Sequence, residues 1–287
     1  MGNKKSKSLS KPSQSMNKAV LENILKIDVT DYERIRREQQ LFKVFWHNNF
    51  SAPVHNLLIR NGTKVLEVGP GSGIWAGDMA ADYPLTHFTC FDKTSNFACP
   101  VNTHNVEFVL GDAKDGLPFD SNTFDYCYAR SAYLWISLCK KKVTHGEYGI
   151  NELIRVCKPG GWIELLEYKF QIYDAGPRSN ELMKKFQLNV GSCTDLNISD
   201  KLEELLHDNG RLMPIRYNDK VMPLYVKDGK VAELAVQCIL PTIIKMSSLS
   251  QELSPEEFKE TYKLLHYECN QYESHMKHNV FFAQKIR

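Results

Sequence analysis

A glycine-rich turn beside an acidic residue is the stretch of this sequence with the clearest chemistry. Val65-Leu-Glu-Val-Gly-Pro-Gly-Ser-Gly-Ile-Trp75 reads as a strand, a turn with Gly69, Gly71 and Gly73, and the start of a helix. Glycines let the backbone adopt positive φ and approach a ligand, and the helix start offers unpaired N–H groups. The spacing is G-x-G-x-G, whereas the dinucleotide fingerprint needs its third glycine one residue later, at Ile74. No Gly-Lys-Ser/Thr follows, so the turn also lacks the pattern of a phosphate loop.

Three acidic residues lie where predicted strands end. Glu67 closes the strand before the turn, and a carboxylate there would repel a pyrophosphate but suits the ammonium of an amino-acid group. Asp92 closes the second strand, where a carboxylate can accept both hydroxyls of a ribose. Asp112 follows the third strand and can accept from an adenine amino group, while neighbouring backbone at Ala113 pairs with the ring. The carboxyl ends of neighbouring strands converge in a doubly wound sheet, so these acids and the turn predict one pocket.

The elements that must position these residues alternate between strands and helices. From Asn61 onward, short β-branched or aromatic runs alternate with helical segments, which favours parallel strands joined by crossover helices. We expect strands at 64–68, 87–91, 106–110, 124–128 and 162–166, and helices at 74–83 and 149–157, the second ended by Lys158-Pro-Gly-Gly161. Beyond Tyr168 we expect helices around 180–189, 199–209 and 254–272, mixed segments between them, and a last strand at 278–285. The predicted fold class is α/β, a Rossmann-like doubly wound sheet with a helical cover.

The predicted organisation is one domain preceded by a tail. Residues 1–28 are polar and lysine-rich, and we expect them to form a disordered basic tail. Thr30-Asp-Tyr-Glu33 has the capping-box pattern, and apolar residues recur behind it at helical spacing. The domain therefore spans 29–287, with a leading amphipathic helix at 29–50, a core at about 52–168, and a cover with the final strands at 169–287.

Composition narrows the range of partners. Lys+Arg 36 against Asp+Glu 34 gives a formal net charge of +2, and five lysines precede the first acid, so the remainder of the chain is net negative. This balance offers no global field for nucleic acid and argues against it as a partner. No two of the 8 cysteines form a C-x-x-C pair, and we expect no metal site. The sequence has no apolar stretch of about 18 residues and no apolar signal segment, so we expect a cytoplasmic protein, with nuclear or membrane-associated locations as alternatives.

These motifs resemble the class I S-adenosylmethionine-dependent methyltransferases and, within them, the fungal LaeA-like group. The shared segments are Asp31-Tyr-Glu-Arg-Ile-Arg, Gln39-Gln-Leu-Phe, Ala52-Pro53, the Gly-x-Gly-x-Gly-Ile-Trp turn, Phe124-Asp-Tyr-Cys-Tyr-Ala-Arg130 and Lys158-Pro-Gly-Gly-Trp-Ile-Glu164. The resemblance implies S-adenosyl-L-methionine as the cofactor, with Glu67 and the turn glycines at its methionine end, Asp92 at its ribose and Asp112 at its adenine. It also implies that Tyr32, Phe42 and Trp46 close over the cofactor. Glu-Val-Gly-Pro-Gly replaces the commoner Asp-Ile-Gly-Thr-Gly but retains the carboxylate.

The sequence signals for the methyl acceptor are less specific than those for the cofactor. The segment Ala129-Arg-Ser-Ala-Tyr-Leu-Trp135 follows the fourth strand and lacks the Asn/Asp-Pro-Pro-Tyr/Phe signature of the family's adenine and glutamine-amide enzymes, which argues against DNA N-methylation. Tyr133 or Trp135 is a candidate for a cation–π contact with the sulfonium, with ordinary core packing as the alternative. His145 is a candidate base, with a surface histidine as the alternative. The predicted function is methylation of a small molecule or a protein side chain; the alternative is a regulatory protein that binds the cofactor with little or no turnover.

The amino terminus carries a separate signal. Met-Gly-Asn-Lys-Lys-Ser6 fits the N-myristoylation pattern, and Lys7 and Lys11 follow it. One acyl chain binds a membrane only marginally, but a chain and a basic patch together give two signals. The sequence therefore predicts either contact with a membrane surface through this tail or a plain basic tail, beside a methyl acceptor and a regulatory protein partner.

Overall fold

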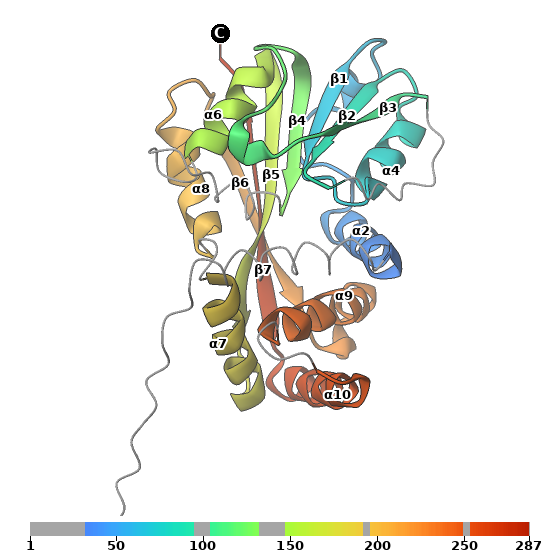
Figure 1. The fold of residues 1–287 in the computed structure, drawn as a ribbon, viewed down its shortest axis with the longest axis vertical. Coiled ribbons are helices and arrows are strands. Elements are labelled where there is room, and N and C mark those ends of the chain that lie inside the picture. The colour runs from blue at the N-terminus through green and yellow to red at the C-terminus, as the bar shows by residue number, and fades with distance from the viewer. Residues whose placement is uncertain (1–31, 95–103, 132–146, 192–195, 249–252, 287) are drawn as a thin grey trace, which may run out of the picture.

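A seven-stranded mixed sheet with helices on both faces forms the centre of the molecule (Figure 1). The computed structural model describes residues 32–94, 104–131, 147–191, 196–248 and 253–286. Its strands are β1 Lys64–Val68, β2 His87–Asp92, β3 Val106–Leu110, β4 Phe124–Arg130, β5 Cys157–Tyr173, β6 Arg216–Pro223 and β7 His275–Gln284. They follow the order β3-β2-β1-β4-β5-β7-β6. The predicted α/β doubly wound class is confirmed.

The order of the strands reverses between β1 and β4. The first five strands pair in parallel, β1 with both β2 and β4. The last strand, β7, runs antiparallel between β5 and β6. Because the chain leaves β1 in one direction along the sheet and returns to β4 on its other side, the carboxyl ends of β1 and β4 form the switch point at which such sheets bind ligands.

Helices cover both faces of this sheet. They are α2 Tyr32–Trp46, α3 His55–Leu58, α4 Ile74–Asp82, α6 Glu147–Val156, α7 Pro177–Gly191, α8 Ile198–His207, α9 Lys230–Ser247 and α10 Pro255–Tyr272, with 3-10 turns at Ala113–Asp115 and Val226–Asp228. None of these helices within the described ranges is long and apolar enough to cross a membrane. The predicted tail at 1–28 lies outside the described residues.

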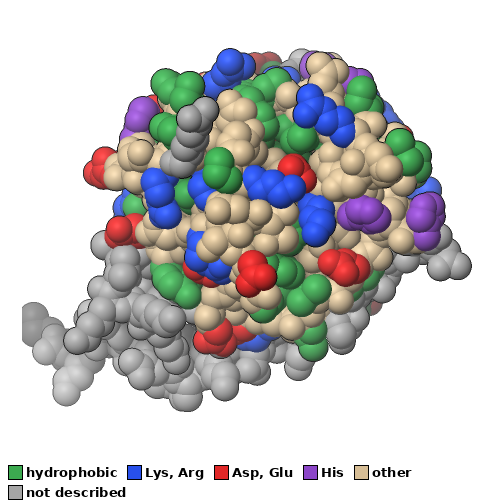
Figure 2. All heavy atoms as spheres, turned by 90° about the horizontal axis from the view of Figure 1, so that it is seen from above, with side chains coloured by type: hydrophobic (Ala, Val, Ile, Leu, Met, Phe, Trp, Pro, Cys, Tyr) green, Lys and Arg blue, Asp and Glu red, His purple; other side chains and the backbone are tan. Residues whose placement is uncertain are grey.

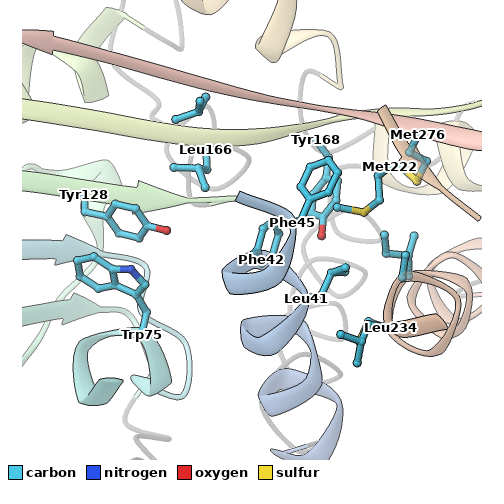
Figure 3. Packing of buried hydrophobic residues seen from close by; sticks show 14 of the residues in the cluster. Leu41, Phe42, Phe45, Trp75, Tyr128, Leu166, Tyr168, Met222, Leu234 and Met276 are labelled. Atoms are coloured by element: carbon cyan, nitrogen blue, oxygen red, sulfur yellow. The ribbon is translucent and has the colours of Figure 1, made fainter. Parts of the chain in front are cut away.

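Alternate residues of the strands pack into two separate cores. Tyr126 and Tyr128 of β4 face the core shared with α2, α4, α7, α9 and α10. Cys127 and Ala129 between them face the core shared with α6 and α8. This alternation is the period of a strand buried on both faces. Figure 3 shows α2 in the first core, with the stacked Trp75 and Tyr128 on one side and Tyr168 on the other. The leading helix is therefore part of the core and not an outer layer.

The strand expected at 162–166 is much longer than predicted. β5 begins at Cys157 and continues to Tyr173, so the chain remains in the sheet past Tyr168, where we expected the pattern to change. The expected turn Lys158–Gly161 lies inside this strand because Gly160 N–H donates to Lys285 O (2.8 Å) and Lys285 N–H donates to Gly161 O (2.9 Å). These bonds come from the far end of the chain, which the local sequence does not reveal.

The sequence analysis did not predict helix α9, which lies in a region where we expected only mixed segments. Its 18 residues contain Pro241, a helix breaker in most contexts. Most of its side chains are buried, so the apolar residues leave no regular polar face. A helix that is apolar on most sides has no regular alternation of apolar and polar faces, so the periodicity of apolar residues did not reveal α9.

A buried carboxylate fixes the segment that follows α2. Glu164 of β5 is fully buried and accepts N–H groups from Ser51 (2.8 Å) and Ala52 (2.7 Å) and the hydroxyl of Tyr126 (2.9 Å). Burial raises the pKa of Glu164 to about 7, and the three hydrogen bonds oppose that rise. The Ala52-Pro53 and Trp-Ile-Glu164 segments of the family resemblance therefore meet at one hydrogen-bonded point.

Replacing Glu164 by alanine should destabilise the protein strongly, since three donors, two of them in the buried residues Ala52 and Tyr126, would lose their acceptor. We expect the free energy of unfolding to fall by about 3 kcal/mol or more, because each unsatisfied buried group costs about 1–3 kcal/mol. Urea denaturation followed by circular dichroism measures this change. The control is Glu203→Ala on the exposed side of α8, for which we expect a change within about 0.5 kcal/mol. Equal urea midpoints for the two variants would contradict the role of Glu164.

Candidate active site

The glycine-rich turn stands at the carboxyl end of β1 with open space above it. Gly69, Gly71 and Gly73 all have positive φ, at 72°, 56° and 75°. Gly69 N–H donates to Phe91 O (2.9 Å), which ties the turn to β2, and Gly73 is the N-cap of α4. A Cβ built on Gly71 would meet no atom within 4 Å. The backbone here is thus shaped to face a ligand and not a neighbouring side chain.

Asp92 is bonded directly to this turn. Its Oδ2 accepts the Gly71 N–H (3.0 Å), and its Oδ1 accepts the N–H (2.9 Å) and the hydroxyl (3.1 Å) of Thr94. Burial raises the pKa of Asp92, and these hydrogen bonds oppose the rise. The second strand and the turn, which we assigned to one pocket from the sequence, therefore share a hydrogen bond.

Glu67 lies beneath the turn on β1 and is only 4% exposed. Cys90 Sγ donates to its Oε2 at 3.7 Å. Burial raises the pKa of Glu67 to about 7, while the positive charge of Arg130 is the largest influence that lowers it. Glu67 is therefore poised to change its protonation state near neutral pH.

Asp112 and Ala113 continue the same edge of the sheet. Gly111 N–H donates to Asp92 O (2.8 Å), so the chain leaving β3 stays beside the end of β2. Asp112 forms an ion pair with Lys93 Nζ at 3.2 Å, and Ala113 begins a short 3-10 turn. All seven residues predicted to bind the cofactor are thus placed along the carboxyl ends of β1, β2 and β3.

Arg130 belongs to this site, although we assigned it no role from the sequence. It ends β4, its Nη1 donates to Gln39 Oε1 of α2 (2.7 Å), and its guanidinium lies 4.6 Å from the centre of the Phe42 ring. Two carboxylates, Glu38 of α2 and Glu67 of the neighbouring strand, act electrostatically on its charge. Its place at the end of the Phe-Asp-Tyr-Cys-Tyr-Ala-Arg motif was the only sequence signal for such a role.

The residues predicted to lie near the methyl acceptor, or to close over the cofactor, do not all lie at the site. Tyr133, Trp135 and His145 lie outside the described residues. Phe42 is buried and lies under Arg130, and its contact with the cofactor stays a prediction. Trp46 instead donates from Nε1 to His278 Nδ1 (3.1 Å), which places it against β7. In the described part of the chain, no group of three or more His, Cys, Asp or Glu side chains is placed to hold a metal ion.

Comparisons with known proteins agree with this geometry. Residues 65–161 match the family described as "Methyltransferase domain". A secondary metabolism regulator, laeA of Coprinopsis cinerea, is 26% identical over 166 residues, 55% of this chain and 38% of that protein. A demethylmenaquinone methyltransferase of Staphylococcus aureus (strain JH9) is 33% identical over 115 residues, 38% of this chain and 44% of that protein. The chain thus spans less than half the length of either relative.

A solved structure extends the likeness of the fold over almost the whole chain. The phosphoethanolamine N-methyltransferase 2 of Haemonchus contortus, in complex with S-adenosylhomocysteine, matches with a TM-score of 0.54 and 18% identity. The match covers 91% of this chain and 59% of that protein. Residues 65–161, which match the methyltransferase family, contain the glycine-rich turn and the first four strands of the sheet, so the family match and the fold agree.

Proposed function

We propose that this protein is an S-adenosylmethionine-dependent methyltransferase that acts on a small molecule or a protein side chain. The observation that carries the proposal is the open glycine turn bonded to Asp92 through the Gly71 N–H. In this proposal Asp92 accepts the ribose hydroxyls, Asp112 and the backbone at Ala113 hold the adenine, and the turn faces the methionine end.

Two opposite charges at the switch point support the orientation of the methionine end. Glu67 on β1 and Arg130 on β4 lie on adjacent strands, and each influences the other electrostatically. The amino-acid part of the cofactor carries an ammonium and a carboxylate, so Glu67 suits the first and Arg130 the second. In this proposal the cofactor carboxylate adds to the interactions that Arg130 already has with Glu38 and Glu67.

The chain's own contribution to the chemistry is mainly placement. When bound, S-adenosylmethionine would supply an electrophilic methyl group on a sulfonium, for transfer to a lone pair of the acceptor with a thioether sulfur as the leaving group. The turn, Asp92 and Arg130 fix one reactant, and α2 covers the site on the side of Arg130. Correct placement in a water-poor site is enough to lower the barrier of such a displacement substantially. A base is needed only when the attacking atom carries a proton.

The function predicts that Gly71→Val abolishes binding of S-adenosylhomocysteine and leaves the fold intact. The new side chain would occupy the open space over the turn, and its positive φ adds strain. Gly210→Val is the matched control, because Gly210 has φ of +66° and equally open surroundings but lies after α8. Titration calorimetry measures the affinity, with NAD as a ligand that we expect not to bind. Normal binding by the Gly71 variant would show that the pocket is misplaced.

Cofactor affinity should depend on pH through Glu67. Its pKa is raised to about 7, and the proposed site uses its ionised form, so binding must release a proton below that pH. We expect affinity for S-adenosylhomocysteine to fall as the pH drops from about 8 to about 6, with a slope approaching about tenfold per pH unit. The Glu67→Gln variant has no proton to release at this position, so it should bind S-adenosylhomocysteine more weakly and its affinity should change little with pH. Calorimetry over this range tests the assignment, which fails if both proteins show the same slope.

A regulatory protein that binds the cofactor without turnover is the second candidate. The similarity to the laeA regulator supports it and also supports membership of the fungal LaeA-like group. A scan of acceptor pools with methyl-labelled cofactor separates the two functions. Label transferred to any acceptor by the wild type, and not by Gly71→Val, favours the enzyme; binding without transfer favours the regulator.

The proposed location rests on the sequence alone, since the tail lies outside the described residues. We propose a cytoplasmic protein whose Gly2 is myristoylated and whose tail lysines add attraction to anionic lipid. Gly2→Ala should then move the protein to the soluble fraction without changing cofactor affinity. Intact-mass spectrometry of protein from a eukaryotic host tests the proposal, and a free or merely acetylated amino terminus would end it.

A further inference from the structure

A cavity of about 130 Å³ opens beside the proposed methionine end of the cofactor site. Gly69 of the turn, Arg130 and Ser131 line one end of it. Its other lining residues come from α2, β5, α7, α9 and β7. Figure 3 shows Tyr168 and Met276, two of its lining residues, on the side of α2 opposite Trp75 and Tyr128. The cavity therefore connects the cofactor site to the interior of the helical cover.

The inner end of the cavity is apolar. Phe186 of α7, Ile243 of α9 and Met276 of β7 line it, and each is less than 5% exposed. Ile239 and Met246 of α9 complete the same wall. Thr242 is the polar residue on that stretch of α9, and its hydroxyl already donates to Cys238 O (3.0 Å). A ligand group in this part of the cavity would meet hydrocarbon, aromatic rings and sulfur.

The end next to the turn is polar. The buried Ser131 hydroxyl has no hydrogen-bond partner among the described residues, and Ser131 has a positive φ of 51°, which is rare for a non-glycine residue. Arg34 and Glu38 form an ion pair at 3.0 Å on the α2 side. An unpaired buried hydroxyl is costly and favours a ligand with a polar atom at this end.

We propose that this cavity binds the methyl acceptor, and that the acceptor is a small molecule with an apolar ring or short hydrocarbon group that enters the cavity and a polar atom that meets Ser131. This inference rests on the proposed function and narrows its substrate class. The volume is close to that of an engineered apolar cavity of about 150 Å³ that binds benzene. One ring therefore fits, with the polar atom at the methyl side.

The same lining disfavours a protein side chain as the acceptor. A lysine or arginine side chain that entered through the cover would carry its cation past Ile243, Met246 and Phe186 before it reached the polar end, and desolvation of a charge along such a path is costly. A larger cavity of about 240 Å³ between α7, α9 and α10 is lined by charged residues such as Arg178 and Lys185, and none of its lining residues belongs to the turn or to β4.

The test compares two probes on the full chain, p-cresol for a ring with a hydroxyl and N-acetyl-lysine methylamide for a protein side chain. Ligand-observed NMR titration measures both affinities, with and without S-adenosylhomocysteine. We expect saturable binding of p-cresol and no saturable binding of the lysine probe. Thr242→Phe should weaken p-cresol binding by about tenfold or more, because the new ring fills the cavity. Thr242→Val retains the shape and should leave the affinity within about twofold.

The matched control is Thr261→Phe, the same change at a half-buried helical threonine that lines the larger cavity. It should leave p-cresol binding unchanged, and all variants should retain the wild-type affinity for S-adenosylhomocysteine. Should Thr242→Phe fail to fold, methyl-labelled methionine gives a second readout: p-cresol should shift the signals of Met246 and Met276 but not that of the exposed Met213.

Three results would overturn the proposal: no saturable p-cresol binding, tighter binding of the lysine probe, or equal weakening by Thr242→Phe and Thr261→Phe. Loss of S-adenosylhomocysteine binding by the wild type would instead refute the proposed function, and the p-cresol titration alone would still decide what the cavity holds.

Discussion

The hydrogen bond from Arg130 to Gln39 joins the leading helix to the carboxyl edge of the sheet, and both halves of the proposed site depend on it. Gln39 is buried and also donates to Asn49 (3.0 Å) and to Asp78 of α4 (3.2 Å). Arg130 in turn lies over Phe42, which places the helix beside the end of β4. This arrangement places the guanidinium of Arg130 at the proposed cofactor site, and it places α2 along one wall of the cavity.

The aromatic packing of α2 keeps this arrangement fixed. Phe42 contacts Tyr168 and His278, with ring centres 5.6 and 4.9 Å apart, and Trp46 donates to the His278 ring nitrogen. Burial, aided by the charge of Arg130, lowers the pKa of His278 to about 3, so the imidazole stays neutral and can accept that bond. A neutral histidine among aromatic rings adds no second cation near Arg130.

The sequence predicted those parts of the structure that local signals encode. β1, the turn and α4 follow one another within twenty residues, and strand periodicity with glycine spacing was sufficient to place Glu67, Gly71 and Asp92. Arg130 was missed because its contact with Gln39 spans 91 positions of sequence. The extension of β5 was missed because Lys285 provides its bonds, and α9 because burial on most sides removed its period. Each failure is one of long-range packing.

The contrast between local sequence signals and long-range packing also explains why similarity to known proteins indicates the cofactor but not the methyl acceptor. The matched domain at 65–161 contains the turn, the three acids and Arg130. Of the residues that line the cavity, only Gly69, Arg130 and Ser131 lie within it; all the others come from α2 or from Tyr168 onward. Cofactor binding constrains strand ends that every enzyme of this fold must share, whereas the acceptor wall consists of helices that can change independently of them. A relative that shares only the matched domain therefore says little about the acceptor, and the apolar residues of α7 and α9 are where the specificity of this chain must be sought.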